Sequence, residues 1–147
     1  MQTEILLING PNLNMLGVRK PEVYGKTTLF DIENELMSYA DKKDCKLICF
    51  QSNHEGAIID EIHKAYGKIH GIIINPGAYT HYSYAIRDAI ESVMIPTVEI
   101  HLSDIKNREP FRSVSVIEPV AIKQISGHGK EGYLMALDCL LDYLENN

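Results

Sequence analysis

Short apolar runs recur along this sequence, and they restrict its fold more than any other feature. Five of them predict buried strands, at residues 4–9, 46–50, 71–75, 97–102 and 121–125. Helical spacing of apolar residues predicts helices over residues 28–41, 55–67, 82–92 and 132–144. Because strands that are apolar throughout are typical of sheets covered on both faces, the pattern predicts a parallel sheet between two helical layers.

Strand and helix are predicted to alternate five times, and right-handed crossovers return each strand beside an earlier one. Five strands suit the flavodoxin-like order 2-1-3-4-5, so we expect an α/β three-layer sandwich. The chain has 147 residues without repeats, low-complexity segments or linkers, and it is expected to form a single domain, residues 1–147.

Composition narrows the class of protein further. Apolar residues make up 45% and charged residues 23%, which is typical of globular proteins. The net charge of −6 argues against nucleic acid as a partner, although a local basic pocket can sit on an acidic protein. The three cysteines form no disulfide framework, and no signal peptide or membrane-spanning run is visible, so a cytoplasmic location is expected.

The stretch GPNLNMLGVRKPEVYG, residues 10–25, follows the first predicted strand. It is too polar for a core segment and longer than the roughly 2–6 residues of an ordinary strand-to-helix loop, and we expect a structureless loop. A free tyrosine has a pKa near ~10 and is a poor base, but a guanidinium can lower an ionisable group's pKa by roughly 1–3 units. Arg19, Arg108 and Arg112 could act on Tyr24 in this way. Alternatively, Tyr24 anchors the loop and Arg19 is a solvated charge.

Polar residues collect where the predicted strands end. In an open parallel sheet ligands bind beyond the carboxyl ends of the strands, near the reversal of strand order. The ends of the first, third and fourth strands are expected to form one crevice, and its candidate residues are Asn12, Tyr24, Asn75, His81 and His101. This convergence predicts an active site.

Glu99 and His101 lie two residues apart on a strand and therefore point to one face. A carboxylate beside an imidazole favours the protonated ring, as a general acid requires; a structural hydrogen bond is the alternative. His81 and Asp88, seven apart near a helix start, are expected to share a face, and taken alone they fit an ordinary surface pair. Asn75-Pro76-Gly77 also fits a simple turn.

Several common sites are missing from the sequence. No HExxH metal motif, Walker loop, GxGxxG fingerprint or GxSxG elbow is present. A flavodoxin-like phosphoreceiver or flavin carrier remains a rival class. A receiver needs acidic residues where this chain has Asn9, Asn12 and Asn75, and Gly10-Pro11-Asn12-Leu13 does not match a flavin phosphate loop.

The chain resembles the type II 3-dehydroquinate dehydratases of the shikimate pathway over nearly its whole length. The resemblance is carried by five stretches, INGPNLNMLGVRKPEVYG, FQSNHEGAIID, IINPGAYTHYSYAIRDAI, VEIHLSDIKNREPFR and SGHGKEGYLMAL. The chain departs from the usual family pattern at Tyr82, Tyr84, Asp104, Ser113, Val114 and His128.

The resemblance implies dehydration of 3-dehydroquinate to 3-dehydroshikimate by anti elimination through an enolate, without a metal or organic cofactor. It makes Tyr24 the base that takes the C2 proton, kept ionised by Arg19 with help from Arg108. It has Asn12 place a water on the enolate oxygen. It assigns protonation of the departing C1 hydroxyl to His101, which Glu99 orients.

The resemblance also implies a substrate-binding set and an assembly. Substrate hydroxyls and carboxylate would be bound by Asn75, His81, Arg112, Leu102 and Ser103, the last two through their backbone N–H groups. Asp88 would reach the site of a neighbouring subunit. The family usually assembles as a homo-dodecamer, a tetramer of trimers, so this is the oligomer that the resemblance predicts.

Overall fold

The computed structural model describes residues 2–18 and 20–147, with the side chains of Val23 and Tyr24 left out. A five-stranded parallel sheet has the order β2-β1-β3-β4-β5, which confirms the predicted topology. The strands are β1 (Thr3–Asn9), β2 (Cys45–Gln51), β3 (Gly71–Asn75), β4 (Thr97–His101) and β5 (Lys123–Ser126).

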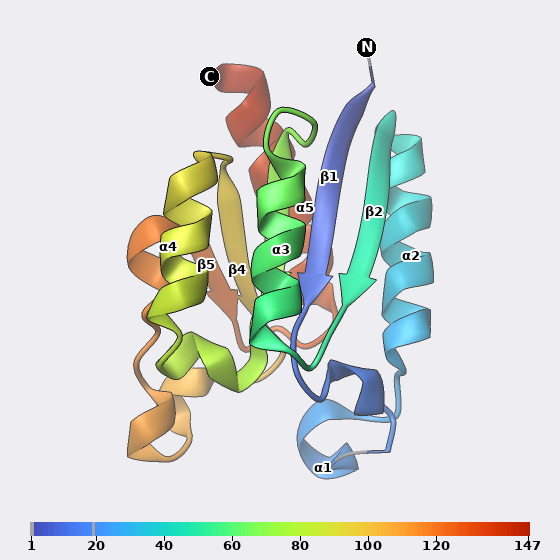
Figure 1. Cartoon of the computed structure of the whole chain (residues 1–147). Coiled ribbons are helices and arrows are strands. Elements are labelled where there is room, and N and C mark those ends of the chain that lie inside the picture. The colour runs from blue at the N-terminus through green and yellow to red at the C-terminus, as the bar shows by residue number, and fades with distance from the viewer. Residues whose placement is uncertain (1, 19) are drawn as a thin grey trace.

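Two helical layers enclose the sheet, with α3 (Glu55–Ala65) and α4 (Tyr84–Val93) on one face and α2 (Leu29–Lys42) and α5 (Glu131–Asn146) on the other. Figure 1 shows α3 and α4 in front of the strands and α5 behind them. Alternation along each strand divides the core: Leu6 and Ile8 pack under α3 and α4, whereas Ile5 and Leu7 pack under α2 and α5.

Two predictions about connections are wrong. Residues 10–25 are not structureless, because they contain the 3₁₀ turn η1 (Leu13–Met15) and the short helix α1 (Pro21–Tyr24). Leu13 and Leu16 are buried in the core and anchor this segment.

The alternation of strand and α-helix also fails between β4 and β5. In the described chain this crossover consists of three 3₁₀ turns, η3 (Ile105–Asn107), η4 (Pro110–Arg112) and η5 (Glu118–Val120). The sheet remains parallel there because the crossover still carries the chain back to the start of β5. One residue of this crossover, Ser115, donates a hydrogen bond to Glu99 of β4.

The carboxyl edge of the sheet carries a row of amides. The strand register aligns Gln51, Asn9 and Asn75 across β2, β1 and β3. Gly10, directly after β1, donates its N–H to the Asn75 carbonyl oxygen over 2.8 Å, so the loop begins tightly against β3. No helix in the described residues is long and apolar enough to cross a membrane.

Candidate active site

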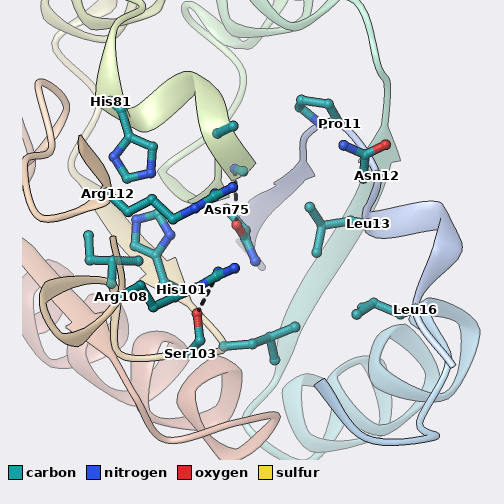
Figure 2. Close-up of a pocket in the computed structure, with 14 residues that line it drawn as sticks. Pro11, Asn12, Leu13, Leu16, Asn75, His81, His101, Ser103, Arg108 and Arg112 are labelled. Carbon is teal, nitrogen blue, oxygen red and sulfur yellow. Dashed lines mark hydrogen bonds between the residues drawn. The ribbon is translucent and has the colours of Figure 1, made fainter. Parts of the chain in front are cut away.

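A pocket opens at the carboxyl ends of β1, β3 and β4, where the sequence predicted a crevice. Its polar lining comes from residues far apart in the chain, namely Asn12, Asn75, His81, His101, Ser103, Arg108 and Arg112, and Leu102 also lines it. Figure 2 shows Asn12 on one side of the pocket, Asn75 at its back, and the histidines and arginines on the other side. The fold therefore brings eight of the twelve predicted site residues to one place.

Glu99 lies just outside this lining, fully buried beneath His101. One Glu99 oxygen, Oε2, forms a very short hydrogen bond with Nε2 of the His101 ring. The same oxygen accepts from Thr80 Oγ1 over 2.5 Å and from Ser115 Oγ over 2.8 Å. The pairing predicted from the two-residue spacing is therefore present, inside a larger network than the sequence indicated.

The Glu99 carboxyl is held in its ionised form. Burial alone would raise its pKa, but hydrogen bonds and the charge from His101, with further bonds from Thr80 and Ser115, lower the pKa below its usual value. An ionised carboxylate is only an acceptor, so the His101 nitrogen that faces it carries a proton. The pair can therefore stabilise an imidazolium, which is the protonated form of an acid catalyst.

His81 has a fixed tautomer for a similar reason. Its Nδ1 lies 2.7 Å from the carbonyl oxygen of Val114, and a carbonyl oxygen can only accept, so Nδ1 carries the proton. The second ring nitrogen of a neutral His81 then remains as an acceptor for a ligand hydroxyl. The ring also lies edge-on to Phe111, with centroids 6.5 Å apart.

Two arginines place positive charge at the pocket. Arg108 Nη1 donates to Ser103 Oγ over 3.4 Å, as Figure 2 shows. Arg112 forms an ion pair with Glu109 and lies 4.9 Å from the Phe111 ring centroid. The hydrogen bond and charge of Arg112 lower the pKa of Glu109. Anionic or hydroxyl-rich ligands suit such a lining.

Asn12 enters the pocket from the first loop. Its backbone is left-handed, with φ 71°, and its N–H donates to Asn53 Oδ1 over 3.0 Å. Gln51 Nε2 also donates to Asn53 Oδ1, over 3.2 Å, and to the Gly10 carbonyl oxygen, over 3.1 Å. The side-chain amides of Gln51, at the end of β2, and of Asn53 thus hold the loop in place.

Three further predicted site residues are not among those that line the pocket. Arg19 and the side chain of Tyr24 are outside the described residues. Asp88 is exposed on α4 and does not line the pocket. The argument that His81 and Asp88 share a helix face is wrong, because His81 ends the separate 3₁₀ turn η2 (Gly77–His81) and α4 begins only at Tyr84.

Sequence reasoning missed Thr80 and Ser115 as partners of Glu99. Ser115 lies 16 residues beyond Glu99, and no local spacing signals their contact. Tyr133 was missed as well, although its hydroxyl bonds Asn9 and Asn75 beneath the pocket. Its position on α5 was predicted only as part of an apolar helix.

Comparison with known proteins assigns this arrangement to a family. The sequence model of the family described as "Dehydroquinase class II" matches residues 3–141 of this chain. The chain belongs to the class II dehydroquinase family. It is 57% identical over 141 residues to the 3-dehydroquinate dehydratase of Bacillus cytotoxicus, covering 96% of this chain and 97% of that protein. It is 54% identical over 140 residues to that of Anoxybacillus flavithermus, covering 95% of each.

Solved dehydroquinases have the same fold. The type II dehydroquinase of Butyrivibrio crossotus is 52% identical with a TM-score of 0.94, covering 95% of this chain and 98% of that one. That of Propionibacterium acnes is 37% identical with a TM-score of 0.93, covering 97% and 98%. This chain is accordingly a type II dehydroquinase, an enzyme and not a flavodoxin-like binding module.

The positions at which the sequence was expected to depart from the family pattern lie at the surface. Six residues are exposed, Tyr82, Tyr84, Asp104, Ser113, Val114 and His128. Asp104 caps η3 by accepting from the N–H of Lys106 over 3.1 Å. None of the six lines the pocket, so the dehydroquinase site keeps its polar set.

Proposed function

We propose that this dehydroquinase converts 3-dehydroquinate to 3-dehydroshikimate in the shikimate pathway, by anti elimination through an enolate. The observation that carries the proposal is the pairing of His101 with a buried, ionised Glu99 at the wall of a pocket that also holds Asn12, Asn75 and two arginines. Elimination of a hydroxyl needs an acid on the leaving oxygen and a base on the neighbouring carbon.

His101 is the proposed acid. The Glu99 carboxylate favours the imidazolium, which protonates the C1 hydroxyl so that it leaves as water. Hydrogen bonds from the hydroxyls of Thr80 and Ser115 hold the Glu99 carboxylate against the His101 ring. Little reorganisation is therefore needed when the proton leaves the ring.

Tyr24 is the proposed base, kept as a phenolate by Arg19, with Arg108 assisting. The phenolate takes the proton from C2, alpha to the ketone. Asn12 positions a water that donates to the enolate oxygen formed in that step. Exclusion of water by residues 10–25 would strengthen the attraction between guanidinium and phenolate, because the local dielectric falls.

Substrate binding falls to the remaining residues of the pocket. Asn75, His81 and Arg112, with the backbone N–H groups of Leu102 and Ser103, bind the hydroxyls and the carboxylate. No metal or organic cofactor takes part in this scheme. The protein's own donors neutralise the charge of the enolate.

Assembly and location complete the proposal. The chain forms a homo-dodecamer of four trimers in the cytoplasm, and Asp88 reaches the site of a neighbouring subunit. The exposure of Asp88 on α4, away from its own pocket, supports this role. Analytical ultracentrifugation tests the assembly; a monomer at assay concentrations would refute it.

A direct assay tests the reaction. Addition of 3-dehydroquinate should produce the ultraviolet absorbance of the conjugated enone. Tyr24→Phe should lower kcat by at least about 100-fold, the contribution of a positioned acid or base. Tyr66→Phe is the matched control, since Tyr66 is 64% exposed and does not line the pocket. A Tyr24→Phe enzyme near the parent rate would eliminate Tyr24 as the base.

Isotope exchange separates the two half-reactions. His101→Ala should lose dehydration while exchange of the C2 proton with solvent continues, because the base is intact. Loss of both processes would contradict the proposed division of work between Tyr24 and His101.

A further inference from the structure

A buried chain of hydrogen bonds runs from the pocket into the core between the sheet and α5. The register places Asn9 and Asn75 side by side on β1 and β3, and both side chains meet the Tyr133 hydroxyl. All three residues are at least 97% buried, since Asn9 is 0%, Asn75 is 3% and Tyr133 is 1% exposed. Of the three, only Asn75 lines the pocket.

The direction of the hydrogen bonds in this chain is determined at its first member. The backbone N–H of Gly77 can only donate, and it points to Asn75 Oδ1 over 3.1 Å. The Asn75 amide nitrogen therefore faces Tyr133 and donates to its hydroxyl oxygen over 3.0 Å. The Tyr133 hydroxyl in turn donates its single proton to Asn9 Oδ1 over 2.6 Å.

The reverse orientation is excluded by the same contacts. If Asn75 turned its oxygen to Tyr133, its NH₂ group would face the N–H of Gly77, and two donors would meet. Burial raises the pKa of Tyr133, so the hydroxyl keeps its proton and remains a donor to Asn9 at every working pH. The side-chain oxygen of Asn75 thus accepts from the Gly77 N–H. One of the two N–H groups of the Asn75 amide donates to the Tyr133 hydroxyl.

We propose that Tyr133, held by Asn9, is a positioning residue that locks the Asn75 amide so that Asn75 offers its second N–H as a donor to the substrate. The group it recognises is then an acceptor oxygen, either of the carboxylate or of a hydroxyl. This inference rests on the proposed function, in which Asn75 binds substrate, and it assigns a role to two buried residues outside the pocket.

Kinetics of Tyr133→Phe test the inference. Phenylalanine keeps the ring but removes the acceptor of Asn75, so substrate binding weakens in the ground state and the transition state alike. KM should rise about tenfold, as expected for one misplaced hydrogen bond, with kcat within about twofold of the parent. Tyr39→Phe is the control, because the Tyr39 hydroxyl donates to Asp138 over 2.8 Å and neither residue lines the pocket. KM should not change in this variant.

A double-mutant cycle distinguishes positioning from a general loss of stability. In an Asn75→Ala background the Tyr133→Phe change should alter KM by less than about twofold, because its target is already gone. Full additivity of the two changes would overturn the inference. Asn9→Leu provides a second variant, because it removes the acceptor of the Tyr133 proton together with Asn9 Nδ2, which is buried without a partner among the described residues. It should raise KM in the same direction and be non-additive with Asn75→Ala in the same way.

A crystal structure of Tyr133→Phe separates this inference from the proposed function. Rotation of the Asn75 amide away from the Gly77 N–H supports the inference even if the parent protein fails to dehydrate 3-dehydroquinate, a result that would refute only the function. An unmoved Asn75 amide, or a Tyr133→Phe enzyme with the KM of Tyr39→Phe, overturns the inference while the function stands.

Discussion

Removal of the Thr80 hydroxyl tests whether the network around Glu99 stabilises a buried charge. Thr80 Oγ1 donates to Glu99 Oε2 over 2.5 Å, and both residues are fully buried. Thr80→Val keeps the shape of the side chain and deletes this donor. A hydrogen bond to a charged group contributes about 1.5–3 kcal/mol, so the free energy of unfolding at pH 7 should fall by about 2 kcal/mol.

That loss has a thermal equivalent and a pH dependence. For a chain of this size about 2 kcal/mol corresponds to a Tm lower by about 4–8 °C. The pKa of Glu99 is lower in the folded protein than its ordinary value. Its charge therefore stabilises the fold above the unfolded pKa of about 4.3, and this stabilisation disappears as the pH falls through the folded pKa. The difference between parent and Thr80→Val should shrink below about pH 4 for this reason.

Urea unfolding followed by circular dichroism between pH 3 and 8 measures both quantities. Thr80→Ser is the matched control, since it keeps the hydroxyl and should retain most of the stability at pH 7. A loss smaller than about 0.5 kcal/mol for Thr80→Val, or a loss independent of pH, would refute the claim that this hydroxyl stabilises an ionised Glu99.

Three further predictions concern a tight turn beside the site, a helix cap and a buried thiol. Gly10→Ala should destabilise the protein by about 1–3 kcal/mol in urea, because its Cβ would lie 2.7 Å from the Pro76 carbonyl oxygen; Gly56→Ala, with nothing within 4 Å, should be neutral or stabilising. Thr28→Ala removes the capping box of α2 and should cost about 1 kcal/mol by the same measurement, whereas an unchanged midpoint would show that the cap is dispensable. Burial, with the charge of Glu33, raises the pKa of Cys49 to about 12, so alkylation with iodoacetamide at pH 8 should be far slower in the folded than in the urea-unfolded protein; equal rates would contradict this.

Much of the fold followed from local pattern. The apolar runs predicted every strand to within two residues at the start and one at the end, as Gly71–Asn75 illustrates. The helix predicted from Thr28 by apolar spacing begins at Leu29, and the structure shows Thr28 as its N-cap in a hydrogen-bonded box with Asp31. The structure of the crossover between β4 and β5 was harder to predict from the sequence, since its 3₁₀ turns are short and depend on packing against the strand ends.

Only part of the site could be predicted from the sequence, because only some of its contacts are between residues close together in the chain. Glu99 and His101 could be paired from sequence because a strand has a period of two, and that period is a local property of the backbone. Thr80 and Ser115 could not be assigned to the same carboxylate, since their contacts arise only when η2, β4 and the segment before η5 come together. The seven-residue spacing of His81 and Asp88 misled because His81 belongs to a separate 3₁₀ turn that ends before the helix begins at Tyr84.

The sequence by itself therefore determined the layers, the strand order and the edge of the sheet at which chemistry is found, because hydrophobic period and crossover handedness act through neighbouring residues. Only the tertiary structure decided the ionisation of Glu99, the tautomer of His81 and the amide orientation of Asn75. Each of these depends on which donors and acceptors meet in a buried space, and those partners lie far away along the chain.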